Sequence, residues 1–229
     1  MSRRIARLTL DTLADLPVDV RTCLHWERDP VRRAEAERTG EAAAEKEAWV
    51  SSVLLEWGSC GRVLYVDERP AGFILYAPPA FLPGSASYPT APVSEDAVQL
   101  ATARVLDGYA GAGLGRVLMQ VMARDLLTRG DVRAVECFGV QGRPTDGCPL
   151  PVQFLQQVGF KTHRPHPRHP RMRLDLKSVL TWREEMEAAL TKLLGAVRSP
   201  RPAAAAPRVV AGELSPLRSD RVLGPDATR

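Results

Sequence analysis

The chain is poor in lysine and contains no long apolar segment. Of its 31 basic residues only four are lysines, at positions 46, 161, 177 and 192. Together with the abundant alanine and proline, this excess of arginine is typical of a GC-rich coding sequence and carries no functional signal. No apolar run reaches the ~18 residues that a membrane-spanning helix needs, and the first residues lack the apolar core of a secretory signal. We therefore expect a cytoplasmic protein without a membrane partner.

The sequence also lacks the spacings of metal and disulfide motifs. No two of its four cysteines, at positions 23, 60, 137 and 148, are spaced as CxxC. We therefore expect neither a disulfide framework nor a zinc site, and the cysteines suit a reducing cytoplasm. Three histidines, at positions 163, 166 and 169, lie among prolines, which exclude a helix that would place them on one face. We expect no metal site there.

A strongly charged face is missing as well. The formal net charge is +4, but residues 198–229 hold six arginines against three acidic residues and so contribute +3 of it. We therefore do not expect a nucleic-acid partner for the folded part. With 45% apolar residues in 229, the chain has enough material for one domain with accessory segments.

The most informative segment is the strand-like run over residues 96–105 and the glycine-rich turn after it. The turn holds Gly111, Gly113 and Gly115, and an amphipathic helical run begins at Leu114. Alternating glycines let the backbone approach a ligand and turn successive N–H groups toward it. The start of a helix adds unpaired N–H groups and the positive end of the helix dipole. The segment predicts a phosphate or pyrophosphate site.

Two common phosphate motifs do not fit this turn. A P-loop needs Gly-Lys-Ser/Thr at its end, whereas Gly115 is followed by Arg116 and Val117. A dinucleotide fingerprint places its third glycine differently and needs an acidic residue about 20 residues further on, in a βαβ pattern that the sequence does not show.

The turn instead resembles the acyl-CoA loop of the GNAT N-acetyltransferases. In that family a strand ending in Val leads into a loop of the form Arg/Gln-x-x-Gly-x-Gly/Ala. Residues 110–115 are similar to it, with Val105 in the expected place and Ala110 where the family usually has Arg or Gln. The hairpin expected over residues 62–76 resembles the family's central hairpin. The segment 154–160 resembles its helix ending in Gly-Phe, with Gly159 as the left-handed cap.

The resemblance covers about residues 3–176 and implies the GNAT acyl-CoA N-acyltransferase fold. This is an α+β (mixed α/β) fold with a central mixed or antiparallel sheet and flanking helices. It also implies acetyl-CoA as co-substrate and an amine, on a small molecule or a protein, as acceptor. Backbone groups in two segments are then expected to hold the cofactor. They belong to Ala103, Arg104, Val105, Ala110, Gly111, Ala112, Gly113, Leu114, Gly115 and Arg116.

The catalytic groups are less clearly marked. Family members often carry a Glu base six residues before the strand-ending Val, where this chain has Gln99, which can position water but cannot accept a proton. The other candidates are Asp96, beside Glu95 at the start of that strand, and Glu136 on the next strand. Alternation places Glu136 on the face of Ala134 and Phe138, and we predict that it is the base. The Tyr that many members use as acid is absent, and Cys148 is a candidate near the CoA sulfur.

The C-terminal part extends beyond the GNAT domain, which we assign to residues 1–176. Residues 177–197 are predicted to contain an amphipathic helix opened by a capping box at Thr181. This helix packs on the domain or forms a homodimer seam. Residues 198–229 have the composition of a disordered tail. The alternative function is a regulatory module that binds acyl-CoA without turnover and acts through a protein partner.

Overall fold

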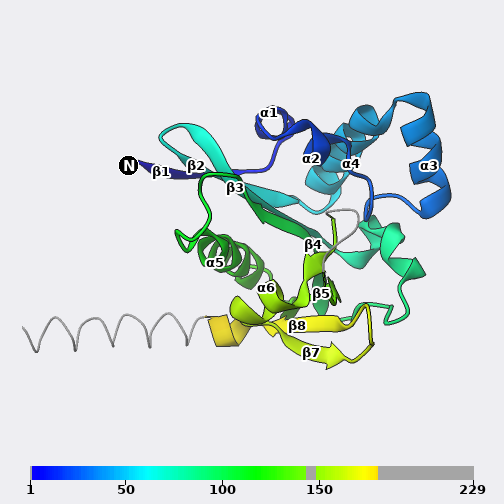
Figure 1. Cartoon of the computed structure of the whole chain (residues 1–229), viewed down its shortest axis with the longest axis vertical. Helices are drawn as coiled ribbons and strands as arrows, with labels where there is room; N and C mark the ends of the chain where they lie inside the picture. Colours follow the sequence, from blue (N-terminus) through cyan, green and yellow to red (C-terminus); the bar gives the residue numbers. More distant parts are fainter. Residues whose placement is uncertain (1, 143–147, 180–229) are drawn as a thin grey trace, which may run out of the picture. The chain divides into compact units, whose positions relative to one another are not determined.

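The computed structural model describes residues 2–142 and 148–179. These residues build a sheet in the order β1-β2-β3-β4-β5-β8-β7, with β6 paired to β5 beside this path (Figure 1). Strand β4 runs parallel to β5 and β6 runs parallel to β5, while the other neighbours are antiparallel. The predicted mixed sheet is confirmed. The strands are β1 (Arg3–Arg7), β2 (Gly61–Val66), β3 (Arg69–Ala77), β4 (Ala97–Val105), β5 (Ala134–Val140), β6 (Leu150–Pro151), β7 (Lys161–Arg164) and β8 (Arg171–Asp175).

Helices cover both faces of this sheet (Figure 1). One core joins α5 and α6 to one face, and a second core joins α1, α2 and α4 to the other. Strand β3 feeds both cores, because its side chains alternate: Ile74 and Tyr76 enter the first, Phe73 and Leu75 the second. The helices are α1 (Leu10–Ala14), α2 (Val18–Thr22), α3 (Pro30–Thr39), α4 (Ala42–Glu56), α5 (Leu114–Leu127) and α6 (Val152–Gln157), with 3-10 turns η1 (Pro79–Phe81) and η2 (Pro83–Ser87).

The first helical segments are shorter than the sequence predicts. The helical spacing of the apolar residues over 13–27 predicts a single helix, but the structure has two, α1 and α2, followed by an irregular segment that begins at Cys23. The alanine- and glutamate-rich sequence after Asp29 and Pro30 predicts one helix that continues into the Trp57 region. In the structure this helix is interrupted at Gly40, whose φ of 78° ends α3 in the left-handed region. The Asp29-Pro30 pair also predicts the start of this helix, and Asp29 is the N-cap of α3, since its carboxylate accepts the backbone N–H groups of Val31 and Arg32. The irregular segment from Cys23 and the break at Gly40 thus divide this part of the chain into separate short helices.

The central strands separate partway along their length. Strand β4 pairs with β3 as far as Val105, but it pairs with β5 only through residues 97–99, opposite residues 134–136. The β3 register also shifts, so that Leu75 lies opposite Thr102 and Tyr76 opposite Leu100. Ala101 is thus an extra residue in β4, as in a β-bulge. Beyond Gln99 the two strands diverge, and the edge of β4 that faces β5 has no strand partner among the described residues.

Part of the C-terminal assignment lies outside the described residues. Residues 176–179 are helical, and the predicted capping box at Thr181 lies outside the described residues. Residues 180–229, with the rest of the predicted helix and the predicted tail, are not among those that the structure describes. Within the two described ranges, every helix is too short or too polar to span a bilayer.

Candidate functional site

The glycine turn links the diverging end of β4 to α5. Gly113 is the N-cap of α5 and has a φ of 74°, and Gly108 and Gly111 have φ values of 86° and 80°. These values lie in the left-handed region that side chains rarely adopt. A Cβ added at any of the three would meet no described atom within 4 Å. The turn is therefore an open backbone surface, as the sequence predicts.

The N-terminus of α5 offers donors to a ligand at this surface. The N–H groups at the start of a helix have no intrahelical acceptor, and Leu114 and Gly115 are the first two residues of α5. The Arg116 N–H donates back to the Gly113 carbonyl at 3.1 Å. The first turn of α5 contains no acidic side chain. The N-terminus thus combines donor groups with the positive end of a 14-residue helix, an arrangement that favours an anion.

The third glycine of the turn has a packing role. A Cβ at Gly115 would lie 3.1 Å from the ring of Phe154, which belongs to α6. Gly115 therefore lets α6 pack close to the start of α5. The predicted cap of α6 is confirmed, since Gly159 has a φ of 100° and the Phe160 N–H donates to the Leu155 carbonyl at 2.9 Å.

The predicted backbone segment Ala103–Val105 lies on the unpartnered edge of β4. Its other edge is occupied by β3, where Val105 is opposite Gly72 and Ala103 opposite Ile74. The segment leads directly into the glycine turn. An extended ligand whose anionic end lies at the turn would find free backbone groups along this edge, in the opening between β4 and β5.

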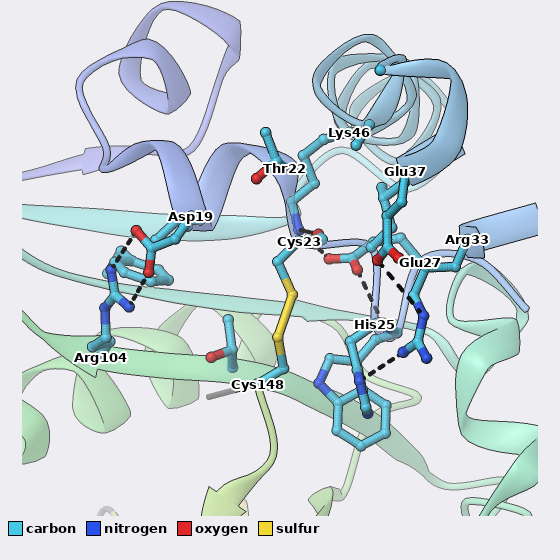
Figure 2. A pocket seen from close by; sticks show the side chains of 17 residues that line it. Asp19, Thr22, Cys23, His25, Glu27, Arg33, Glu37, Lys46, Arg104 and Cys148 are labelled. Carbon is cyan, nitrogen blue, oxygen red and sulfur yellow. Dashed lines mark hydrogen bonds and ion pairs between the residues drawn. A yellow bond between two sulfur atoms is a disulfide. The ribbon is translucent and has the colours of Figure 1, made fainter. Parts of the chain in front are cut away.

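A pocket of about 630 Å³ lies on the opposite face from α5 (Figure 2). Its floor includes Phe73 of β3 and Thr102 and Arg104 of β4. Its walls come from α2, the segment after α2, α3, α4 and Cys148. Thr102 and Arg104 follow the bulge, so the pocket floor includes the part of β4 that is no longer paired with β5.

Ion pairs line this pocket (Figure 2). Arg104 donates to Asp19 at 2.6 and 3.2 Å, and this bond lowers the pKa of the Asp19 carboxyl. Lys46 pairs with Glu27, both almost fully buried. Arg33 donates to His25 Nδ1 at 2.9 Å. Apart from Arg104, these residues were not predicted from the sequence. They come from separate elements and share no local motif that would have indicated them.

Cys23 and Cys148 form a disulfide in this pocket, although the cysteine spacing gave no reason to expect a disulfide framework. They are 125 residues apart, so sequence spacing gives no hint of the pairing. In this state Cys148 has no thiol proton to give, so the proposed approach to a CoA sulfur would require reduction. Cys60 and Cys137 are free and buried.

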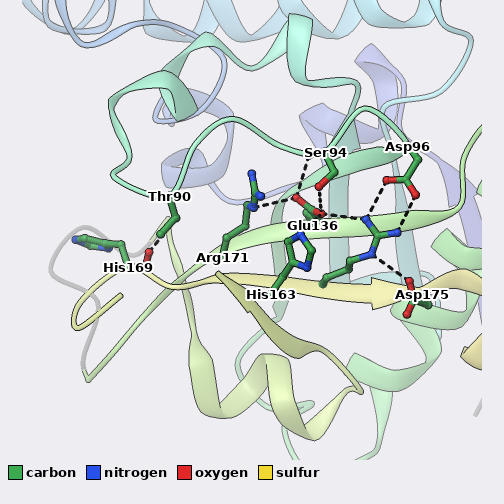
Figure 3. A network of polar contacts seen from close by, with 9 residues as sticks. Thr90, Ser94, Asp96, Glu136, His163, His169, Arg171 and Asp175 are labelled. Carbon is green, nitrogen blue, oxygen red and sulfur yellow. Dashed lines mark hydrogen bonds and ion pairs between the residues drawn. The ribbon is translucent and has the colours of Figure 1, made fainter. Parts of the chain in front are cut away.

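Glu136 lies in a polar network at the start of β5 (Figure 3). Its side chain is on the face of Ala134 and Phe138, as predicted, and is fully buried. Its oxygens accept the Ser94 hydroxyl at 2.7 Å and an Arg173 N–H at 3.1 Å. They also accept the Ser94 N–H, and Arg171 Nε lies 3.1 Å away. This carboxylate is occupied by donors, so its role as base stays a prediction that its contacts do not favour.

The other two catalytic candidates differ sharply in their surroundings. Asp96 accepts two bonds from Arg173, at 3.0 and 2.9 Å, which lower the pKa of its carboxyl. Gln99 is the last residue of β4 paired with β5, opposite Glu136. Its side chain is fully buried, and neither amide atom has a hydrogen-bond partner among the described residues. Alternation places Gln99 on the face of Ala97 and Ala101, which is also the face of the pocket.

Comparison with known proteins identifies the fold. No family model and no curated protein matches the chain in sequence. Among solved structures, the PaiA N-acetyltransferase of Thermoplasma acidophilum in complex with coenzyme A is similar, with 13% identity and a TM-score of 0.50 over 76% of this chain and 99% of that one. An aminoglycoside acetyltransferase in complex with coenzyme A has 14% identity and a TM-score of 0.50, over 80% of this chain and 99% of that one. An N-acetyltransferase of Staphylococcus aureus is 12% identical in sequence and has a TM-score of 0.50, over 77% of this chain and 99% of that one.

Proposed function

We propose that this chain, which has the GNAT acetyltransferase fold of those structures, transfers an acyl group from acyl-CoA to an amine. The observation that carries the proposal is the continuity of three features. Strand β4 leaves β5 after Gln99, runs on with a free backbone edge to Val105, and leads into the open glycine turn at the start of α5. An extended ligand with a phosphate at one end and amides along its length fits this succession of sites.

The glycine turn is the proposed pyrophosphate site. Backbone N–H groups from Ala110 to Arg116 would hold the phosphate oxygens, and the edge Ala103–Val105 would pair with the pantetheine amides. Two of the similar structures are complexes with coenzyme A, which supports this assignment by analogy of fold. Acyl-CoA supplies a thioester, whose carbonyl carbon is open to attack by an amine.

The pocket on the opposite face is the proposed acceptor site. Its floor includes Thr102, on the part of β4 that is no longer paired with β5, so we infer that an amine approaches the thioester from the side away from α5. The amine must lose a proton before or during the attack, since an ammonium group has no free electron pair. The buried amide of Gln99 is suited to hold a water or the amine near the divergence point, because its own donor and acceptor have no described partner.

The structure also favours a second candidate function, an acyl-CoA-binding regulatory module. The carboxylates that the sequence offers as bases, Glu136 and Asp96, both pair with Arg173. A chain without a positioned base would bind acyl-CoA and transfer its acyl group slowly or not at all. The two candidates share the CoA site and differ only in turnover.

Two measurements separate them. Calorimetry with acetyl-CoA tests the shared site, and we expect saturable binding that Gly113→Glu abolishes. Release of the free CoA thiol with a panel of amines, including small amines, polyamines, an aminoglycoside and peptides with free N-termini, tests turnover. Amine-dependent release above the rate without amine would establish the transferase. Tight binding with no release across the panel would favour the module, and no binding would overturn both.

A further inference from the structure

The Cys23–Cys148 disulfide crosses the acceptor pocket. Both cysteines line the pocket, and Figure 2 shows their bond between the Asp19–Arg104 ion pair on one side and His25 with Arg33 on the other. The bond therefore lies within the space that an acceptor would use.

The two cysteines belong to opposite sides of the opening between β4 and β5. Cys23 directly follows α2, which is tied to β4 by the Asp19–Arg104 pair. Cys148 lies two residues before β6, and β6 pairs with residues 139–140 of β5, beyond the point where β5 has left β4. A covalent bond between them bridges the β4 side and the β5 side on the acceptor face.

We propose that Cys23 and Cys148 form a reversible redox site that controls entry of the acceptor. In the disulfide form the bond restricts the path across the pocket to Thr102 on its floor. In the dithiol form the two walls are no longer tied and the acceptor enters. This inference rests on the proposed transferase function and adds a condition under which it operates.

The oxidation is a thiol–disulfide exchange with a low-molecular-weight disulfide such as oxidised glutathione. One cysteine thiolate attacks a sulfur of the oxidant and displaces one thiolate, which leaves a mixed disulfide. The second cysteine thiolate attacks the protein sulfur of that mixed disulfide and displaces the second thiolate. Two electrons pass from the cysteines to the oxidant, and the two thiol protons end on the two released small thiols. Excess small thiol reverses both steps.

The location of the cysteines suits such exchange. Cys23 and Cys148 are partly exposed, so a small disulfide can reach them. Cys60 and Cys137 are fully buried, and burial raises the pKa of the Cys60 thiol to about 12. The exchange should therefore be selective for the pocket pair.

The test compares oxidised and reduced protein in glutathione buffers, with the disulfide quantified by mass spectrometry of the peptides. On reduction we expect the KM for the best amine to fall at least about tenfold, while the affinity for acetyl-CoA changes little, because the glycine turn lies at the start of α5 on the other face. The variants Cys23→Ser and Cys148→Ser should each remove the difference between the two buffers. Cys60→Ala is the matched control and should retain it.

A second measurement does not depend on finding an acceptor. Hydrogen exchange of residues 18–29 and 148–158 should be faster in reduced than in oxidised protein, and equal in the two buffers for Cys23→Ser. If amines are acetylated with the same KM in both buffers, the inference is wrong and the transferase function stands. If no amine is acetylated in either buffer, the transferase function fails, and the hydrogen-exchange measurement alone tests the redox site. Equal hydrogen exchange in the oxidised and reduced protein then overturns the redox site, and faster hydrogen exchange in the reduced protein supports it.

Discussion

Arg173 joins the two carboxylates that the sequence offers as general bases. Its Nη1 atom lies 3.1 Å from Glu136 Oε1, and the same guanidinium donates to both oxygens of Asp96. Arg173 is directly opposite Glu136 in the β5–β8 ladder. Proton transfer to Glu136 would weaken a charge-assisted contact with Arg173 and with the nearby Arg171. The arrangement is that of a structural network at the junction of β4, β5 and β8.

The first prediction concerns Glu136→Gln. Glu136 is fully buried and Arg171 is 3% exposed, so removal of the negative charge leaves a buried guanidinium poorly compensated. Breaking a buried ion pair in this way typically costs about 3 kcal/mol or more. We expect a loss of that size in the free energy of unfolding, measured by urea titration. Glu95→Gln is the control, since Glu95 is an exposed neighbour of the network and should show no loss.

Activity assays on Glu136→Gln and Asp96→Asn test whether Glu136 is the general base, as the sequence predicts. If Glu136→Gln is as stable as the parent but loses about 10²–10⁴ in turnover, with partial recovery at high pH, Glu136 is the base. If instead Asp96→Asn alone loses turnover, the proton leaves through the start of β4. Loss of stability without a specific loss of turnover in the remaining folded protein supports the structural role.

Local features of the fold were predictable from the sequence. The strand, glycine turn and helix over residues 97–127 follow from alternation, glycine placement and helical periodicity, each of which is written in neighbouring residues. Alternation also placed Glu136 on the correct face, since it depends only on positions 134, 136 and 138. The break at Gly40 was missed, because the alanine- and glutamate-rich segment around it favours helix on both sides.

Contacts between distant elements were not predictable in the same way. The two arginines that contact Glu136 come from β8, and their approach depends on the β5–β8 register. The Cys23–Cys148 bond joins residues 125 positions apart. The pocket proposed for the acceptor is lined by residues of α2, α3, α4 and β4, and it depends on how these elements pack together. None of these relationships leaves a periodic signal in one sequence, whereas the glycine turn, whose residues are neighbours in sequence, could be predicted as an anion site.

The second prediction concerns the glycine turn. Gly113→Glu places a side chain and a negative charge at the start of α5, where the backbone has a φ of 74°. We expect acetyl-CoA binding to be lost in calorimetry, because the carboxylate repels the pyrophosphate and occupies its place. The control is Gly130→Glu, at a position that also has open space around its Cβ but no positive φ. Unchanged affinity in folded Gly113→Glu protein would remove the turn from the cofactor site.

The third prediction concerns the contact between α5 and α6. Gly115→Ala should lower the free energy of unfolding by about 1 kcal/mol, because the new methyl group would lie 3.1 Å from the Phe154 ring. Phe154→Ala removes that ring, so the cost of Gly115→Ala should largely vanish in its background. A double-mutant cycle by urea titration measures this coupling. Additive effects of the two changes would show that Gly115 and Phe154 do not restrict one another.

The last prediction concerns Gln99, the residue at which β4 and β5 separate. Its amide is fully buried, and its donor and acceptor have no partner among the described residues. A buried polar group without a partner typically costs about 1–3 kcal/mol. Gln99→Leu, which keeps the size and removes the polar atoms, should therefore leave the free energy of unfolding unchanged or raise it. The same change on the surface of α6, Gln157→Leu, is the control and should affect neither stability nor turnover.

The same variant should separate stability from function. If the Gln99 amide holds a water or the amine at the divergence point, Gln99→Leu lowers turnover by about tenfold or more through lost positioning, while the affinity for acetyl-CoA stays unchanged. If Gln99→Leu is more stable but less active than the parent, the Gln99 amide serves ligand positioning and does not stabilise the fold. A Gln99→Leu protein that is less stable by several kcal/mol would mean that the amide is satisfied within the fold, and a fully active one would mean that Gln99 does not touch the reacting groups.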